Sequence, residues 1–117
     1  MSHSPEDVFV LGSQKQWEDV GNGVRRQILG YDNQLMMIAV TFRKGAMGPL
    51  HKHRHRQVTY IESGSFEVQI GTEKRVLKEG DCYFIPPDIQ HGVVALEDSS
   101  LVDVFSPVRE DILASRA

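Results

Sequence analysis

The stretch GAMGPLHKHRHRQVTYIESG, residues 45–64, places three histidines and a glutamine at alternate positions between two glycines. Side chains of an extended strand alternate between two faces, so residues 51, 53, 55 and 57 share one face if this segment is extended. Neutral imidazoles are the commonest metal ligands in proteins. A His-x-His pair within a basic run is, however, more often a solvated surface than a ligand pair. The stretch therefore needs support from the rest of the chain.

The apolar segments of the chain are short, rich in Val, Ile, Phe and Tyr, and separated by turns that contain Gly, Pro, Asn or Asp. Many short strands at this spacing predict an all-β sandwich or barrel rather than alternating strands and helices. We expect strands at Asp7–Leu11, Val24–Gly30, Leu35–Phe42, Gln57–Glu62, Ser65–Ile70, Lys74–Leu77, Cys82–Ile85, His91–Leu96 and Leu101–Phe105. Only Pro107–Ala114 looks helical, because proline suits a first helical turn and acidic residues follow it.

Length and composition indicate an ordinary globular protein with a single domain, residues 1–117. The net charge of −3 does not suggest a nucleic-acid binder, and no window approaches the length of a membrane span. The N-terminus has neither a basic nor an apolar signal region, so we expect a cytoplasmic protein. Cys82 is the one cysteine, which excludes an intramolecular disulfide. Its apolar neighbours predict a buried, inert thiol.

A second stretch, GDCYFIPPDIQHGVVA at residues 80–95, supports the interpretation of the histidines in residues 45–64 as metal ligands. Residues 45–64 have the glycine, histidine and glutamine spacing of the first cupin motif, with Gln57 in place of the usual carboxylate. Residues 80–95 have the glycine, proline and histidine spacing of the second motif, with His91 as its histidine. The chain therefore resembles the cupin superfamily, with core motifs at about residues 36–106.

This resemblance implies an all-β, single-domain cupin fold, a double-stranded β-helix or jelly-roll-like barrel with a short C-terminal helical segment. It also implies a site in which four side chains converge on one divalent metal ion: His51, His53, Gln57 and His91. The alternative is a cupin whose histidines only satisfy hydrogen bonds in a cavity. His55 falls outside the motif, and we expect it to support a ligand rather than to be one.

The glutamine matters for the electrostatics of the predicted site. Three imidazoles and an amide leave the positive charge of the ion uncompensated, which favours Lewis-acid action on an anionic substrate. These donors permit Zn, Ni, Fe, Mn or Co, and the sequence does not choose among them.

A second cluster of interest lies near the C-terminus. Asp103 stands within the apolar segment Leu101–Phe105, on the same face as Leu101 and Phe105. A buried carboxylate is costly unless it finds a cation, a metal ion or hydrogen-bond donors. The residues alone leave two interpretations open: an Asp103–Arg109 salt bridge that anchors the C-terminal segment, or a functional pair near the cavity.

The chain also resembles a narrower group, the small pectin-degradation cupins of the KdgF family. The stretches that carry this resemblance are HKHRHRQVTY, GDCYFIPP, HGVVALED and DVFSPVRED, within residues 45–111. The family is associated with linearising 4,5-unsaturated uronate monosaccharides, the lyase products of pectin and alginate. The resemblance implies the same metal ligands and adds functional residues at Asp103, Phe105 and Arg109.

In this interpretation Asp103 is a general acid/base, Arg109 binds the substrate carboxylate and Phe105 packs against the sugar ring. The expected partner is a small acidic sugar. Two other functions stay open: an iron-dependent oxygenase, and a non-catalytic cupin that binds an acidic sugar. Resemblance to cupins also implies a homodimer, in which the N-terminal strand would pair across the interface.

Overall fold

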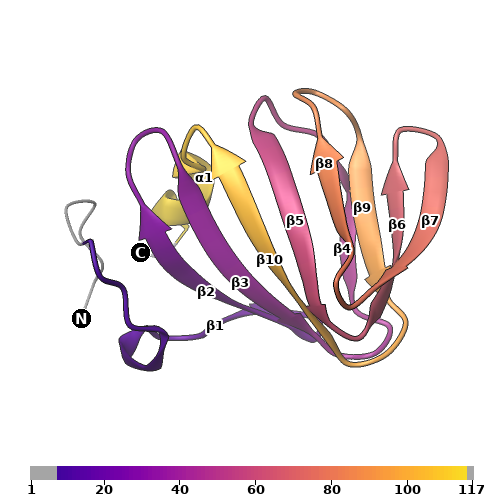
Figure 1. The fold of residues 1–117 in the computed structure, drawn as a ribbon, viewed down its shortest axis with the longest axis horizontal. Helices are drawn as coiled ribbons and strands as arrows, with labels where there is room; N and C mark the ends of the chain where they lie inside the picture. The colour runs from indigo at the N-terminus through magenta and orange to yellow at the C-terminus, as the bar shows by residue number, and fades with distance from the viewer. Residues whose placement is uncertain (1–7, 116–117) are drawn as a thin grey trace.

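The computed structural model describes residues 8–115 and contains two antiparallel sheets (Figure 1). The elements in chain order are η1 (Gly12–Gln14), β1 (Glu18–Gly21), β2 (Val24–Tyr31), β3 (Met36–Phe42), β4 (Met47–His51), β5 (Arg56–Ser63), β6 (Ser65–Ile70), β7 (Glu73–Lys78), β8 (Cys82–Ile85), β9 (His91–Ala95), β10 (Ser99–Ser106) and α1 (Glu110–Ala114). The six-stranded sheet has the order β1-β2-β3-β10-β5-β8, and the four-stranded sheet has the order β4-β9-β6-β7.

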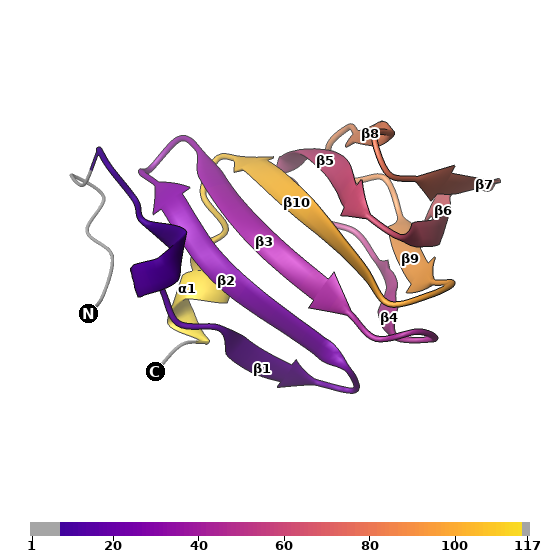
Figure 2. The same cartoon turned by 60° about the horizontal axis from the view of Figure 1, so that its bottom comes forward.

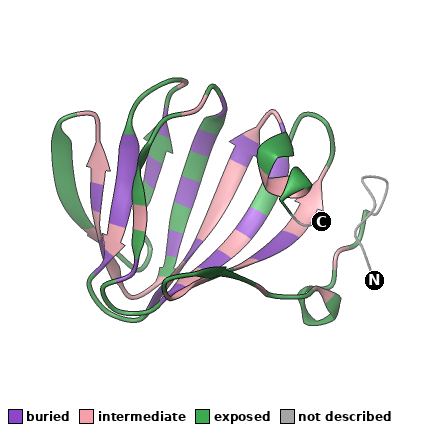
Figure 3. Ribbon diagram, turned by 180° about the vertical axis from the view of Figure 1, so that it is seen from behind, coloured by how far each residue is buried: buried purple, intermediate pink, exposed green. Residues whose placement is uncertain are grey.

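Figure 2 shows the two sheets from a second direction. The buried apolar side chains of both sheets form a single core cluster. Inward and outward side chains alternate along the strands, which appears as alternating bands of burial in Figure 3. The rings of Phe42 and Phe66, one from each sheet, meet edge to face with their centroids 5.1 Å apart. The all-β fold predicted from the sequence is confirmed. No helix among residues 8–115 has the length and hydrophobicity needed to cross a lipid bilayer.

Strand predictions fail at the N-terminus. Asp7 lies outside the described residues, and the rest of the predicted first strand, residues 8–11, is not a strand. Val8 and Phe9 are exposed, and no strand pairs with them. The first strand is instead β1, whose charged sequence gives no alternating apolar pattern but which pairs with β2. The sequence analysis also missed β4, which contains Gly48 and Pro49.

Two further predictions need correction. The C-terminal helix begins at Glu110, so Pro107 precedes it instead of lying in its first turn. Cys82 is exposed, because β8 is the edge strand of the six-stranded sheet and Cys82 points away from the core. The apolar neighbours of Cys82 in the sequence therefore did not predict its burial, because only one face of this strand is covered.

Gly64 makes the turn between β5 and β6 and gives a test of the fold. Its backbone has φ of 78°, and a methyl group there would overlap the Ser99 side chain and lie 2.8 Å from the Asp98 carbonyl oxygen. Gly64→Ala is therefore expected to reduce the free energy of unfolding by about 3 kcal/mol, measured by chemical denaturation. Gly71 is the control, because its φ is also positive but its added methyl group would meet nothing within 4 Å. Equal losses for both alanine variants would contradict this account.

Candidate metal centre

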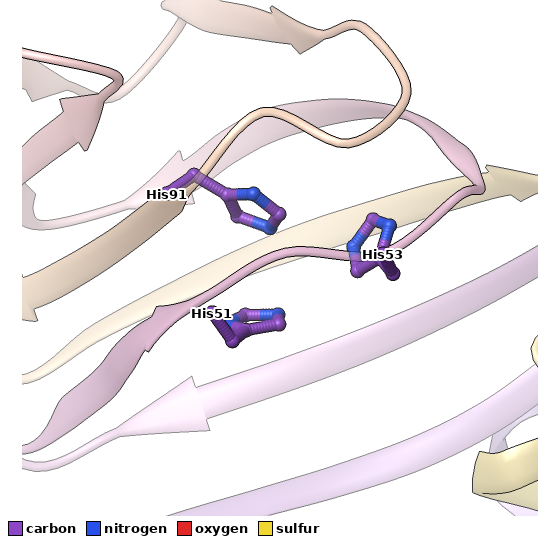
Figure 4. Close-up of side chains that lie close together, drawn as sticks. All are labelled: His51, His53 and His91. Atoms are coloured by element: carbon purple, nitrogen blue, oxygen red, sulfur yellow. The ribbon is translucent and has the colours of Figure 1, made fainter.

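Three histidines lie together where the two sheets approach each other (Figure 4). His51 ends β4, His91 begins β9, and the two are register partners in the four-stranded sheet. His53 follows in the connection to β5. The ligand atoms of the three rings all lie within 4.8 Å of one another. The structure therefore brings together all three predicted histidine ligands.

Each of these rings makes a backbone hydrogen bond through Nδ1. The partners are the carbonyl oxygens of Pro49 for His51 at 2.8 Å, Ile89 for His91 at 2.9 Å and His55 for His53 at 3.1 Å. A carbonyl oxygen only accepts, so Nδ1 carries the proton in neutral His51 and His91, and their Nε2 keeps its lone pair. His53 has an acceptor at each ring nitrogen, because its Nε2 lies 3.1 Å from Oε1 of Gln57. Nε2 of His91 is buried and has no hydrogen-bond partner. A metal ion at the centre of the trio would satisfy this atom, which an apolar or merely structural cluster would leave unpaired.

Burial also favours the neutral form of His53 and His91. It is the main cause that lowers the pKa of His91 to about 4, with smaller contributions from the positive charges of the neighbouring histidines and Arg109. Burial and the Arg109 guanidinium likewise lower the pKa of His53. Because metal ions bind neutral imidazole, His53 and His91 do not need to lose a proton before binding at neutral pH.

Gln57 approaches the histidines from the other sheet, as an inward residue of β5. Its Oε1 lies 3.1 Å from Nε2 of His53, while its Nε2 donates to the hydroxyl of Thr59 at 2.9 Å and to Oδ1 of Asp103 at 3.1 Å. These hydrogen bonds fix the orientation of the amide, with its oxygen towards the histidines. Three imidazole nitrogens and one amide oxygen fit a divalent ion, and such donors suit Zn, Ni, Fe, Mn or Co.

The chain between His51 and Gln57 is not the continuous extended segment that the alternation predicts. One strand ends at His51 and the next begins at Arg56 in the opposite sheet, so residues 52–55 cross from one sheet to the other. The ligands converge because of this crossing and not because they share a strand face. His55 is buried beside His53, with ring centroids 5.4 Å apart, and it is not part of the trio.

Asp103 lies in the middle of β10, directly opposite Thr59 of β5. Its Oδ1 accepts hydrogen bonds from the Thr59 hydroxyl at 2.5 Å and from the Gln57 amide. Burial raises the pKa of Asp103 to about 6, although these hydrogen bonds and the Arg109 charge oppose the rise. A carboxyl group with a pKa in this range exchanges a proton readily near neutral pH.

Arg109 does not form the anchoring salt bridge with Asp103 that we considered from the sequence. Among residues 8–115 it pairs with Asp111, through Nε to Oδ1 at 2.9 Å and Nη2 to Oδ2 at 2.8 Å. Its guanidinium carbon lies 4.9 Å from the centroid of the Phe105 ring, which in turn lies 5.8 Å from the His53 ring. Arg109, Phe105 and Asp103 thus line one cavity of about 430 Å³ together with His51, His91 and Gln57.

Two polar residues of this site, Thr59 and Tyr83, are not among those predicted from the sequence. Thr59 is fully buried and hydrogen-bonds both Gln57 and Asp103. Tyr83 is buried on β8, and burial and the Asp103 carboxylate raise the pKa of its hydroxyl. The period-two alternation from Gln57 could have placed Thr59 on the inner face, but its contact with Asp103 depends on the β5–β10 register.

Comparison with known proteins agrees with this geometry. A family model described as a cupin domain matches residues 38–105. The pectin degradation protein KdgF of Dickeya dadantii (strain 3937) is 47% identical over 107 residues, which cover 90% of this chain and 97% of that protein. The chain belongs to the KdgF family of cupins. The resemblance inferred from its motifs is therefore confirmed.

Two solved structures share the fold over nearly the whole of this KdgF-family chain. An RmlC-like cupin from Shewanella frigidimarina NCIMB 400 has a TM-score of 0.89 and 43% identity, with coverage of 92% of this chain and 96% of that one. KdgF from Halomonas sp. has a TM-score of 0.87 and 41% identity, with coverage of 91% and 98%.

Proposed function

We propose that this cupin linearises 4,5-unsaturated uronate monosaccharides released from pectin or alginate, in an isomerase-type reaction that requires a divalent metal ion. The observation that carries the proposal is the position of Asp103, a half-buried carboxyl group joined through Gln57 to a histidine trio suited to metal binding. Similarity to the Dickeya pectin degradation protein supports an enzyme of uronate breakdown.

The cavity fits such a substrate in size and chemistry. Its volume of about 430 Å³ accommodates a monosaccharide, and its walls combine apolar side chains with a few polar groups. A 4,5-unsaturated uronate carries one carboxylate, two or more hydroxyl groups and an enol ether formed by the ring oxygen and C5. The cationic Arg109 and the metal site suit the carboxylate, whereas the Phe105 ring offers an apolar surface to the sugar ring.

The reaction moves one proton and breaks one ring bond. Asp103 accepts the proton of the C1 hydroxyl while the bond between C1 and the ring oxygen breaks, which gives an aldehyde and an enolate at C5. The same carboxyl group then returns the proton to C4, and the enolate becomes a ketone. No atom is gained or lost, so a single acid/base group is sufficient. His51, His53, His91 and Gln57 would hold a divalent ion, which would supply Lewis-acid stabilisation of negative charge on the substrate.

Arg109 would hold the substrate carboxylate while Asp111 holds Arg109. The two hydrogen bonds to Asp111 use Nε–H and one Nη2–H, which leaves three of the five guanidinium N–H donors for substrate. Only 12% of the Arg109 side chain is exposed, so its charge is directed into the cavity. The ion pair thus fixes the plane of the guanidinium before substrate arrives.

Arg109→Lys tests this role. Lysine keeps the charge but cannot form the two-point contact with a carboxylate, so KM is expected to rise about 10-fold with a smaller change in kcat. Steady-state kinetics on the unsaturated uronate measures both constants. Asp111→Asn tests the orienting ion pair separately, because it keeps the guanidinium and one acceptor oxygen for it, so KM should rise by less than in Arg109→Lys. A KM unchanged in Arg109→Lys would contradict carboxylate binding by Arg109.

The proposed function is tested with a freshly prepared lyase digest. Linearisation removes the conjugated alkene, so ultraviolet absorbance should fall faster with metal-loaded protein than in the spontaneous reaction, and chelation should abolish the difference. Elemental analysis of the purified protein identifies the metal. A rate equal to the spontaneous one would refute the proposal. Oxygen uptake confined to an iron-loaded form would favour an oxygenase, and substrate binding without turnover would favour a binding protein.

A further inference from the structure

His55 is a buried histidine that neither the candidate metal site nor the acid/base group explains. It is 9% exposed, and it does not belong to the histidine trio. Its Nδ1 is buried and has no hydrogen-bond partner among residues 8–115. An unpartnered polar atom in the interior destabilises a protein, and an apolar ring could fill the same space without that cost. The contact of the other ring nitrogen therefore explains a histidine here better than packing does.

Strand register places His55 beside the segment that follows β10. The last pair of the β5–β10 ladder is Arg56 with Ser106, so the next positions along the two strands are His55 and Pro107. Figures 1 and 2 show these strands side by side. Proline has no N–H group to donate, so the ladder cannot continue in the same way. His55 thus lies where the chain leaves β10 and enters the segment that carries Arg109.

One ring nitrogen of His55 hydrogen-bonds the backbone of Val108. This nitrogen is Nε2, since Nδ1 has no partner. Burial, together with the charge of Arg109, lowers the pKa of His55, so the ring is neutral at neutral pH. The bond to Val108 itself favours the protonated ring, which identifies Nε2–H as the donor and the Val108 carbonyl oxygen as the acceptor. The same oxygen accepts from the N–H group of Glu110 at 3.1 Å, within the segment.

His55 also contacts the metal-binding side of the cavity. Its backbone carbonyl oxygen lies 3.1 Å from Nδ1 of His53, and the two rings meet edge to face with their centroids 5.4 Å apart. The His53 ring lies 5.8 Å from that of Phe105, whose centroid is 4.9 Å from the guanidinium carbon of Arg109. These contacts join a candidate metal ligand to the cation of the cavity, with His55 touching both sides.

The backbone beside Arg109 has other anchors, which leave a role for this hydrogen bond. The Val108 side chain is buried in the core, and its N–H group reaches the carbonyl oxygen of Asn33 at 3.3 Å. The Arg109 guanidinium pairs with Asp111, which belongs to the same segment. The bond from His55 differs from these anchors, because it ties the segment to residues 52–55, the crossing that carries His53.

We propose that His55 is a positioning residue that fixes Arg109 relative to the histidine trio. A carboxylate that contacts both Arg109 and a metal ion needs a set distance between them. The crossing between the sheets already holds His53. By tethering the Val108 carbonyl group to the same crossing, His55 sets this distance. The inference rests on the proposed function, in which Arg109 binds the substrate carboxylate.

His55→Phe removes the donor and keeps an aromatic ring of similar size. KM for the unsaturated uronate should rise about fivefold with kcat nearly unchanged, because the tether acts on the residue that binds the carboxylate. The variant should unfold at a temperature no lower than that of the wild type, because the unpartnered Nδ1 is gone and the Val108 carbonyl group keeps its Glu110 donor. Steady-state kinetics and thermal unfolding measure the two effects. A residue that only filled the core would not weaken substrate binding while leaving stability intact.

His55→Gln is the rescue variant, because its side-chain amide places an N–H donor near the position of Nε2. Its KM should lie within about twofold of the wild-type value. Arg54→Lys is the matched control for the crossing, since Arg54 is an exposed neighbour and lysine keeps its charge. This control should leave KM unchanged. Equal losses in His55→Phe and His55→Gln would overturn the role of the N–H donor.

Hydrogen exchange provides a measurement that needs no turnover. The backbone amides of residues 108–113 should exchange several-fold faster in His55→Phe than in the wild type, and at the wild-type rate in Arg54→Lys. Calorimetric titration with Zn²⁺ alone should give affinities within about threefold of one another for the wild type and His55→Phe, because the backbone carbonyl group that contacts His53 is retained.

Unchanged KM or unchanged exchange in folded His55→Phe would overturn the inference. A loss of zinc affinity as large as the change in KM would also contradict it, because His55 would then act on His53 rather than on Arg109. A wild-type protein that does not accelerate linearisation would refute the proposed function instead. The exchange measurement alone would then decide whether His55 tethers the segment of Arg109, so the two failures are distinguishable.

Discussion

Asp103→Asn is expected to lower kcat for uronate linearisation by at least about 100-fold. Asparagine has nearly the same shape as aspartate but cannot accept the C1 proton or return it to C4. The Gln57 side chain keeps its contacts with His53 and Thr59, so metal affinity should change little. Stopped or continuous ultraviolet assays give kcat, and calorimetric titration of the metal gives affinity. A variant with near wild-type kcat would remove Asp103 from the reaction.

Thr59 offers graded controls for this prediction. Thr59→Val removes the 2.5 Å hydrogen bond to Asp103 while keeping the shape of the side chain, and Thr59→Ser keeps the hydroxyl. The valine variant should lose about 10-fold in kcat with little change in KM, and the serine variant should recover most of that loss. Equal activity in the valine and serine variants would mean that the hydroxyl has only a packing role.

The pH dependence of the rate gives an independent signature of the same carboxyl group. Asp103 must be ionised to accept the C1 proton, so kcat/KM should fall as the pH drops through its pKa. Burial raises that pKa to about 6, and a bound cation would draw it back towards the ordinary value of about 4. The acid limb should therefore lie between these values, and it should be absent from the residual activity of Asp103→Asn.

The sequence predicted what depends on local pattern and motif spacing. His51, His53 and His91 were identified because cupin motifs fix their spacing, and the central strands were identified because Val, Ile and Phe alternate with polar residues. What it could not predict depends on pairing partners. β1 is polar and becomes a strand only through its pairing with β2. The apolar residues 8–11 pair with no strand and are not a strand themselves.

The errors at Cys82 and in the segment 51–57 have the same origin. Cys82 lies in an apolar run, but the run belongs to an edge strand with one face turned outward. The histidine segment alternates like a strand, but it crosses between sheets. In both cases the local pattern is present in the sequence. The position of the segment relative to the two sheets, which the pattern does not contain, determines which side chains are buried and where they point. The β5–β10 register similarly created the Thr59–Asp103 contact, which no linear motif contains.

Gln57 joins the candidate metal site to Asp103, the proposed acid/base group. Its amide presents an oxygen to the histidines and an N–H donor to Asp103. A carboxylate at this position would provide a stronger metal ligand, but it would have no proton to donate and would place a second negative charge beside Asp103. The amide can therefore face a metal ion with its oxygen and hydrogen-bond the Asp103 carboxylate with its N–H group. A carboxylate at position 57 would bind the metal ion but repel the Asp103 carboxylate.

Gln57→Glu is accordingly expected to bind the metal more tightly, by about 10-fold, and yet to lower kcat by about 100-fold at neutral pH. The added charge makes the ion a weaker electrophile and raises the pKa of Asp103, so less of the ionised carboxylate is present. Part of the activity should return as the pH is raised, because Asp103 then ionises. Metal titration and a pH–rate profile measure these opposite effects on one variant.

The double variant Gln57→Glu/Asp103→Asn distinguishes two effects of Gln57→Glu. One is charge repulsion between the two carboxylates, and the other is loss of the amide N–H donor. Asparagine at position 103 can donate to the new carboxylate, so the double variant should unfold at a higher temperature than Gln57→Glu alone while remaining inactive. If Gln57→Glu instead retains wild-type kcat and an unchanged pH profile, the amide does not couple the two sites. In that case Asp103 would act independently of the metal ligand beside it.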